Sequence, residues 1–507
     1  MSLVWTRRSF LASSAASASL CSTTPLLAGL PALRMDEVRG TDVVTLRPEI
    51  EPLVRLIEDT PREKLLEEIG QRIKTGLSYR EVLSALFLAG VRNVEPYPSV
   101  GFKFHAVLVV NSAHLASVAS PEADRWLPIL WALDSFKGSQ ARDVSEGNWT
   151  MKPVREDRVP SAETARDEFH QAMQSWDKER ADVAAAGITR TLEATQVLEL
   201  FAEYAARDFR AIGHKVIYLA NAWRTLQTIG WEHAEPVLRS LAYAMLNHNG
   251  EPNPSTADLS PDRSWRQADV AAQKIRQGWT SGKVDSSATE DLLSVLRTGS
   301  ASEAIEATVR LLNDGIDPQS ICDALHLSSG ELLMRQSGIV ALHAVTTTNA
   351  VRFLFDTVTS DATRKRLLLQ NAAFIVQFRE AMSGRGKVAD GNILDLKLQA
   401  SASDSRWTAE QVFEEVSRNR RQAAEKVVMN HDVSDMPADE LMNVARRLIF
   451  MKGTDSHDYK FSSAALEDYA KVTSVYRGIL LASSMFNLKG SGDPDNPLFA
   501  RMRAALG

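Results

Sequence analysis

Four histidines recur along this chain at similar intervals, and their side chains could bind a metal ion or take part in catalysis. They are His105, His214, His343 and His457, and the intervals between them are 109, 129 and 114 residues. Imidazole is a good ligand for zinc, iron, copper and nickel, and a few imidazoles suffice when water or a carboxylate completes the coordination. Asp458, next to His457, is the candidate carboxylate, either as a metal ligand or as the partner that orients a ring.

The same histidines have a simpler interpretation as core residues. A histidine at the start of a helix is often buried, with its ring hydrogen-bonded to a nearby backbone carbonyl. Other catalytic motifs offer no alternative, because the chain has no H-E-x-x-H, C-x-x-C-H or G-x-S-x-G, and residues 381–387 lack the first glycine of a phosphate loop. Any chemistry predicted from this sequence therefore depends on the four histidines.

A repeated order of helices is predicted around the histidines. Residues 76–90 (GLSYREVLSALFLAG) align with residues 315–330 (GIDPQSICDALHLSSG), and each segment precedes a helix that opens at a histidine. Residues 197–205 and 440–450 precede the other two histidines in the same way. A third helix is then predicted in each unit, at residues 126–136, 233–246, 366–378 and 476–486.

Helical periodicity dominates the chain after its first residues. Val197, Leu200, Phe201 and Tyr204 fall on one face of a helix, and no series of alternating strands separated by Asn-Gly turns is present. We therefore predict an all-α fold in which residues 35–507 form one large helical domain of about four three-helix repeats. If the repeats close into an α/α toroid, equivalent positions converge and the four imidazoles meet in a central pocket.

Three polar stretches are predicted to separate the units. They cover residues 138–160, 249–264 and 383–406. The second contains NGEPNPSTADLSPD, whose glycine and prolines favour a long loop rather than a helix. Loops of this length in a compact domain are often lids or binding loops.

The first 34 residues have the pattern of a twin-arginine signal peptide. Arg7 and Arg8 follow Thr6 and precede Phe10 and Leu11, and a stretch rich in Ala and Ser without acidic residues comes next. Positive charge, a short apolar run and small residues are typical of a signal peptide, and the run is too polar to span a bilayer. We predict export in folded form by the twin-arginine machinery to the periplasm or beyond. An ordinary N-terminal helix is the alternative.

The rest of the chain is acidic. Removing residues 1–34 takes away three basic residues and no acidic one, which leaves 55 Lys and Arg against 64 Asp and Glu, a net charge near −9. Without an excess of basic groups to neutralise phosphates, nucleic acid is excluded as a partner. No membrane span is predicted in the mature part. Cys322 is its single cysteine, so no internal disulfide can form.

Two of the histidine segments resemble a known family. The strings FHAVLVVNSAHL at His105 and LHAVTTTNAVRFL at His343 are similar to the His-rich helices of the questin oxidase-like family. That family is helical and includes fungal enzymes that insert oxygen into aromatic polyketides in a Baeyer–Villiger-type reaction. The resemblance covers two or three segments and implies an oxygen-using oxidoreductase. Residues 207–246 resemble uncharacterised bacterial exported proteins, which implies no activity.

Two functions remain open at this point. The first is an exported oxidoreductase, oxygen-using, whose central pocket is lined by the four histidines and holds a transition metal or a small organic substrate. The second is a non-catalytic helical-repeat protein that binds a ligand or a protein partner on its concave surface. The cofactor is undetermined, with a transition metal as the candidate. The metal content of the purified protein distinguishes the two functions.

Overall fold

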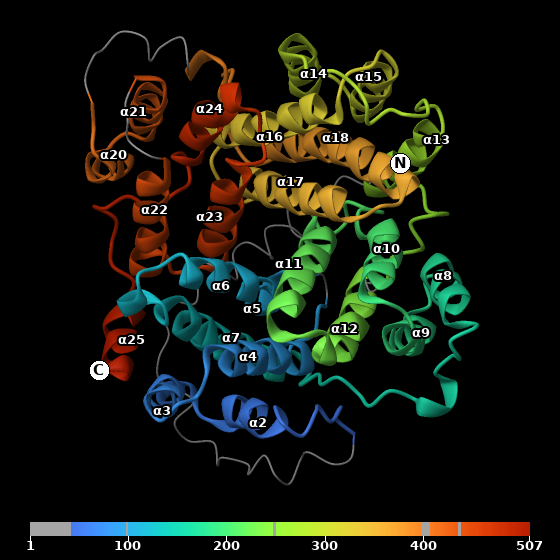
Figure 1. Ribbon diagram of the computed structural model, residues 1–507, viewed down its shortest axis with the longest axis vertical. Helices are drawn as coiled ribbons and strands as arrows, with labels where there is room; N and C mark the ends of the chain where they lie inside the picture. Colours follow the sequence, from blue (N-terminus) through green and yellow to red (C-terminus); the bar gives the residue numbers. More distant parts are fainter. Residues whose placement is uncertain (1–41, 98–99, 247–249, 397–405, 434–437) are drawn as a thin grey trace.

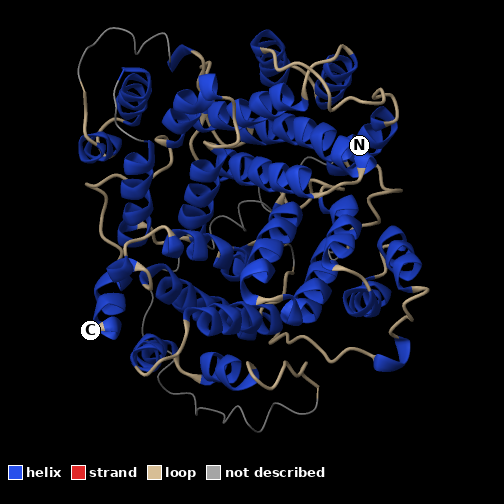
Figure 2. Ribbon diagram, in the orientation of Figure 1, coloured by secondary structure: helices blue, strands red, loops and turns tan. Residues whose placement is uncertain are grey.

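A computed structural model of the chain describes residues 42–97, 100–246, 250–396, 406–433 and 438–507. Within these ranges the regular structure is helical, no β-strand forms, and one isolated bridge pairs Lys283 with Ile316 (Figure 2). The predicted all-α fold is therefore confirmed. The predicted signal peptide, residues 1–34, lies outside the described residues.

Four units of successive helices make up most of the described chain, and each has one of the four histidines in its middle helix. Unit one consists of α4 (Tyr79–Asn93), the broken middle helix α5 (His105–Leu108) and α6 (Val110–Val118), and α7 (Leu127–Glu146). Unit two consists of α10 (Ala194–Ala205), α11 (His214–Ile229) and α12 (Ala234–Leu246). Unit three consists of α16 (Pro318–Arg335), α17 (Ile339–Thr357) and α18 (Asp361–Ser383), and unit four of α22 (Ala438–Lys452), α23 (Ser456–Asp468) and α24 (Ser474–Ser484).

The middle helices form an inner ring, which we define as α5 with α6, α11, α17 and α23. Each middle helix packs against both flanking helices of its own unit. Along the ring, α6 contacts α11, α11 contacts α17, α17 contacts α23, and α23 returns to α6 (Figure 1). The outer helices close in the same order, through the pairs α4–α12, α10–α18, α16–α24 and α22–α7. A regular α/α toroid stays a prediction.

Further helices pack around the four units. They are α2 (Glu51–Asp59), α3 (Arg62–Lys74), α8 (Ala165–Ser175), α9 (Lys178–Thr191), α13 (Ser260–Ala272), α14 (Ser286–Thr298), α15 (Ala301–Asn313), α20 (Ala409–Val416), α21 (Arg420–Val433) and α25 (Leu498–Leu506). Apolar side chains from the units and from these helices form one continuous core. Within the described ranges, none of the helices is both long and apolar enough to cross a membrane.

The predicted match between residues 76–90 and 315–330 corresponds to two equivalent helix starts. Gly76 and Gly315 both adopt positive φ, at +107° and +87°, and end the preceding helices α3 and α15. Two residues later Ser78 caps α4 through a capping box with Glu81, and Asp317 caps α16. The alignment therefore reflects shared turn and cap chemistry as well as shared apolar positions.

Two of the three predicted polar stretches are partly helical. Helix α7 continues to Glu146, because Gln140 and Asp143 are buried and Arg142 pairs with Glu146 one turn along the exposed face. Helix α13 begins at Ser260, because Pro261 lies in its first turn, where a missing amide hydrogen costs nothing. The loop predicted for residues 249–264 was therefore wrong only for its last residues, and the polar stretch 138–160 begins within a helix, since polar composition alone does not exclude a half-buried helix.

Candidate metal centre

The four predicted histidines converge on one point of the inner ring. One ring nitrogen from each of them lies within 4.8 Å of the corresponding atom of the other three, and within the described ranges no acidic residue or cysteine joins this group. We call His105, His214, His343 and His457 the histidine cluster. The prediction that these side chains share one site is confirmed.

The imidazoles follow one another in the same order as the helices of the ring. Neighbouring ring centroids lie 4.9 Å apart for His105 and His214, 4.5 Å for His214 and His343, 5.1 Å for His343 and His457, and 4.4 Å for His457 and His105. The diagonal from His105 to His343 is longer, at 6.4 Å. The four imidazoles therefore follow one another around a closed circuit in which this diagonal exceeds every neighbouring separation.

The Nε2 atom of His214 lies within contact distance of two other Nε2 atoms. Nε2 of His214 is 3.1 Å from Nε2 of His105 and 2.9 Å from Nε2 of His343. His214 and His343 are buried, with 3% and 1% of their surface exposed, whereas His105 and His457 are partly exposed. The cluster is therefore mostly enclosed by the helices that supply it.

On the other side of each ring, Nδ1 contacts an oxygen atom from the same stretch of chain. The pairs are His105 with the Phe102 carbonyl at 2.8 Å, His214 with the Ala211 carbonyl at 2.8 Å, His343 with the Ile339 carbonyl at 2.6 Å, and His457 with the Asp455 carboxylate at 2.5 Å. Because a carbonyl oxygen accepts and never donates, Nδ1 carries the hydrogen in the first three rings. Their neutral forms therefore direct an Nε2 lone pair into the cluster.

The backbone before the histidines is held in an uncommon conformation. Phe102 and Ile212, neither of them glycine, have positive φ of 51° and 44°, and they stand three and two residues before a cluster histidine. Gly213, with φ of +82°, directly precedes His214 and packs against Thr347 of α17. Such conformations cost about 1–3 kcal/mol each and persist where the surroundings require them. Here they fix the approach of two imidazoles to the cluster.

The electrostatics of the cluster favour neutral rings. Burial lowers the pKa of His105, His214 and His343 far below the ordinary histidine value, and positive charge on neighbouring groups lowers it further. The pKa of His457 is also lowered, by burial and by Lys460. Unprotonated Nε2 atoms of His214 and His343 therefore face each other with no hydrogen between them. Two lone pairs at this distance repel unless a cation lies between them.

Asp458, the predicted carboxylate, does not join the cluster. Its carboxylate accepts the backbone amides of Thr454 and Asp455 at the start of α23 and forms an ion pair with Lys489. Asp455 takes the orienting place instead, since it accepts both the backbone amide and the ring Nδ1 of His457. Burial alone would raise the pKa of Asp455, but these contacts hold it below its ordinary value, so the carboxylate is charged.

Lys460 is a second residue that sequence reasoning missed. It follows His457 by three residues in α23, hence on the same helical face, and its side chain is 2% exposed. Its Nζ has no hydrogen-bond partner among the described residues, and its charge acts on all four rings. Burial lowers the pKa of this ammonium to about 7. The three-residue offset from a histidine is the signal that could have identified it.

A cavity of about 520 Å³ lies between α6, α11, α22 and α23. Tyr459 lines it from α23, two residues after His457, and Asn111 lines it from α6, the continuation of the helix that bears His105. None of the four cluster histidines is among the residues that line this cavity, so it neighbours the cluster only through the helices that the two share. It is the place in which a molecule could lie beside the histidine-bearing helices.

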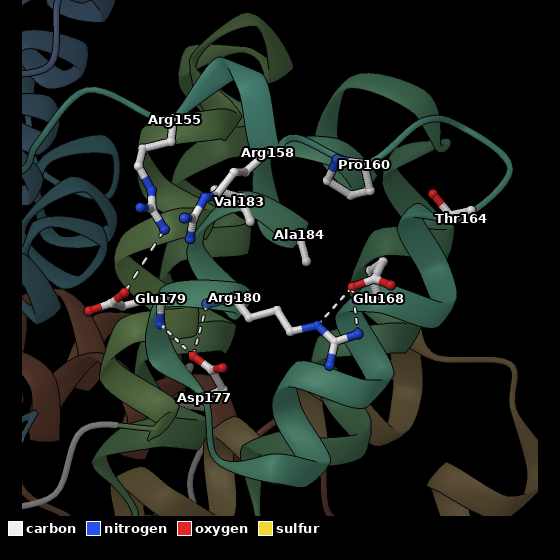
Figure 3. Close-up of a pocket in the computed structure, with 10 residues that line it drawn as sticks. All are labelled: Arg155, Arg158, Pro160, Thr164, Glu168, Asp177, Glu179, Arg180, Val183 and Ala184. Carbon is white, nitrogen blue, oxygen red and sulfur yellow. Dashed lines mark hydrogen bonds and ion pairs between the residues drawn. The ribbon is translucent and has the colours of Figure 1, made fainter.

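Another hollow, of about 490 Å³, lies between the 3₁₀ turn Glu156–Arg158, α8 and α9 and takes no residue from the cluster (Figure 3). Its charged side chains largely pair with one another. Arg180 donates to Glu168 at 2.8 Å, and Arg155 lies 3.9 Å from Glu179. We therefore regard this hollow as a paired charged surface.

No protein-family model matches this chain, and no curated protein sequence and no solved structure matches it either. The resemblance of two short segments to the questin oxidase-like family stays a prediction. The case for a function therefore rests on the geometry of the histidine cluster.

Proposed function

We propose that the histidine cluster binds one divalent transition-metal ion through the four Nε2 atoms. The observation that supports this is the pair of Nε2–Nε2 contacts at 2.9 and 3.1 Å between rings whose Nδ1 hydrogens point away to oxygen acceptors. A metal ion would accept all four lone pairs, and the oxygens behind the rings would fix their tautomers and raise their basicity. Carbonyl and carboxylate partners of this kind are usual behind metal-bound histidines.

The spacing favours a square rather than a tetrahedral arrangement. With metal–nitrogen bonds of about 2.0–2.1 Å, ligands at right angles lie about 2.9 Å apart, whereas tetrahedral ligands lie about 3.4 Å apart. The contact between His214 and His343, at 2.9 Å, matches the first value, and the contact between His214 and His105, at 3.1 Å, lies between the two. Square and tetragonal nitrogen sites suit Cu(II) and Ni(II), whereas structural zinc sites are tetrahedral. Copper is therefore the first metal to test.

We further propose that the metal centre serves an exported, oxygen-using oxidoreductase. A redox-active metal held by His105, His214, His343 and His457 would supply the one-electron chemistry that reactions with oxygen require. The strained backbone before His105 and His214 supports a functional rather than a purely structural cluster. The alternative is a helical-repeat protein that binds a ligand or partner without turnover, and it gains if the protein contains no metal.

Metal analysis of protein produced with its own leader tests the first proposal. We expect about one equivalent of a transition metal, and after copper loading an electron paramagnetic resonance spectrum with coupling to four nitrogens. His214→Gln should lose most of the metal, because it removes a ligand from a cluster of otherwise intact helices. His170→Gln is the matched control, since His170 lies outside the cluster and contacts Tyr204. Wild-type protein that fails to retain added copper contradicts the proposal.

Export is tested separately. Replacing Arg7 and Arg8 by lysine should leave the precursor in the cytoplasm, because the twin-arginine machinery reads the arginine pair. A substitution of Arg34 by lysine is the control for loss of an arginine elsewhere in the leader. Normal periplasmic accumulation of the double variant would contradict the assignment of the leader.

A further inference from the structure

The cavity between α6, α11, α22 and α23 has polar atoms in its wall that lack partners. Asn111 is 2% exposed and its side-chain Nδ2 has no hydrogen-bond partner among the described residues. The hydroxyl of Tyr459, a residue 1% exposed, likewise has none. A buried polar atom without a partner costs about 1–3 kcal/mol. Both atoms therefore point to a molecule that accepts hydrogen bonds in this cavity.

The charge in the wall is positive. Arg446 lines the cavity from α22, donates one hydrogen bond, to Asn443, and forms no ion pair within the part of the chain that the structure describes. Burial lowers the pKa of Arg446, and the negative charge of Asp439 offsets part of this effect. The carboxylate of Glu467 does not balance this charge, because both of its oxygens accept hydrogen bonds from Arg224. Among the described residues, one guanidinium thus lines the cavity without a counter-ion.

The rest of the wall is largely apolar. Leu115 from α6 and Ile449 from α22 contribute aliphatic surface, and the ring of Tyr459 is held by stacking on Trp131 at 4.1 Å. Val118, which is 47% exposed, stands at the edge where the cavity meets solvent. An apolar wall with a few convergent polar groups is typical of a small-molecule site.

We propose that this cavity binds a small organic acid, with its carboxylate against Arg446 and Asn111 and its apolar body along Leu115 and Ile449. A carboxylate would supply the counter-ion that Arg446 lacks among the described residues, and its oxygen would accept a hydrogen bond from the Asn111 amide. The volume of about 520 Å³ suits an acid of one or two rings, or a medium-length aliphatic chain. This binding does not require a metal in the histidine cluster.

Isothermal titration calorimetry on the full-length protein, treated with a chelator, tests the proposal. The probes are 2-naphthoate and octanoate, with 2-naphthamide as the neutral counterpart of the aromatic acid. We expect at least one of the two acids to bind saturably at one site. We expect the affinity for 2-naphthamide to be at least about tenfold lower than that for 2-naphthoate. Because the protein is free of metal in this experiment, failure of the metal proposal does not affect the result.

Two substitutions locate the site. Arg446→Gln should weaken acid binding about tenfold and remove the preference over the amide, and Asn111→Asp should weaken it by repulsion at nearly constant volume. Arg447→Gln is the matched control, because Arg447 is the next residue of α22 but lies 3.5 Å from Asp124 instead. Arg446→Gln and wild type should unfold at the same temperature, because Arg446 is partly exposed. Equal thermal midpoints then show that weaker binding does not result from a loss of folding.

Three results would overturn the proposal. The first is absence of saturable binding of both acids, which leaves a water-filled structural cavity. The second is equal affinity for 2-naphthoate and 2-naphthamide, which removes the role of charge. The third is an Arg447→Gln variant that weakens binding as much as Arg446→Gln, which places the acid elsewhere on α22.

Discussion

The carboxylate of Asp455 accepts the Nδ1 hydrogen of His457, whereas backbone carbonyls do so for the other three rings of the cluster. Asp455 is thus the one side chain that orients a cluster imidazole and can be replaced without altering the backbone. A charged oxygen behind a ring also increases the basicity of its Nε2. If the four rings bind a metal, Asp455 should contribute to its affinity.

We therefore predict that Asp455→Asn weakens metal binding about 10–100-fold. Asparagine remains a good N-cap for α23, so folding should be little affected. Competition with a chelator of known affinity measures the change. Asp458→Asn is the control, because that carboxylate contacts backbone amides and Lys489 and should influence stability rather than affinity. A larger loss of metal in Asp458→Asn would reverse the two roles.

The sequence could predict the four histidines but not the choice between these two aspartates. Both flank His457 within two residues, and either could reach its ring in an unspecified backbone. The outcome depends on α23 beginning at Ser456, which makes Asp455 the N-cap and turns Asp458 back toward the cap amides. Helix starts are uncertain by a residue or two in pattern reasoning, and one residue is enough to exchange the roles.

At the level of elements, the junction before α11 sets the distance between two helices of the inner ring. Gly213 combines a φ of +82° with close packing, since a Cβ there would overlap with the side chain of Thr347 on α17. A larger residue would therefore both strain the backbone and push α11 away from α17. His214 follows directly and would move with it.

We predict that Gly213→Ala destabilises the fold by roughly 2–4 kcal/mol and weakens metal binding, as measured by urea unfolding and by chelator competition. Gly76→Ala is the control, because Gly76 has a φ of +107° but nothing within 4 Å of an added Cβ, so only backbone strain applies. Adding Thr347→Ala to the Gly213 variant should restore part of the stability. Equal losses in the two single variants would show that packing between α11 and α17 is unimportant here.

A titratable pair, His326 and Asp468, joins an outer helix of unit three, α16, to the middle helix of unit four, α23. Nε2 of His326 in α16 lies 3.5 Å from the carboxylate of Asp468 in α23, an ion-pair distance without hydrogen-bond geometry. Burial would lower the pKa of His326, but Asp468 and the Cys322 carbonyl together raise it above its ordinary value. The folded protein therefore holds this proton more tightly than the unfolded chain does.

The sign of the pH dependence follows from that difference. The stabilisation is complete below the unfolded pKa of about 6.5 and is lost as the pH rises through the higher folded pKa. We expect the stability advantage of wild type over His326→Gln to shrink between about pH 6 and pH 8. Urea unfolding over this range, with chelator present to exclude metal effects, measures it. An advantage that grows with pH would contradict the assigned direction.

Helix type and order were predictable because apolar residues recur at helical spacing, whereas some boundaries were not. The middle helix of unit one breaks between Leu108 and Val110, and α17 begins four residues before His343 rather than at it. Neither boundary has a proline, and the start of α17 has only Gly338, which offers no side-chain cap. Both follow from packing within the inner ring, which no local pattern encodes. The histidine cluster could nevertheless be predicted. A helix boundary that is wrong by a few residues does not change which four helices meet, provided that each histidine stays near the first turn of its helix.

At the scale of the whole molecule, each cluster histidine comes from a different unit. Contacts close the inner ring through α6, α11, α17 and α23, and the outer helices close it again. Arg501 of α25 pairs with Glu67 of α3. Because α3 packs against α7 of unit one, this pair ties α25 to unit one. A ligand held by all four histidines would therefore connect units that are remote in sequence.

Metal binding should accordingly stabilise the molecule as one cooperative body. A metal that binds only the folded chain adds about 4 kcal/mol when its free concentration is 1,000 times the dissociation constant. We predict that copper raises the thermal midpoint of the chelated protein while the transition stays single, measured by calorimetry. His214→Gln should lose most of this increase. If copper instead split the transition in two, the units would be unfolding separately and the cluster could not be spanning all four. A single transition with a large shift is expected because losing any one unit removes a ligand and breaks the closed ring.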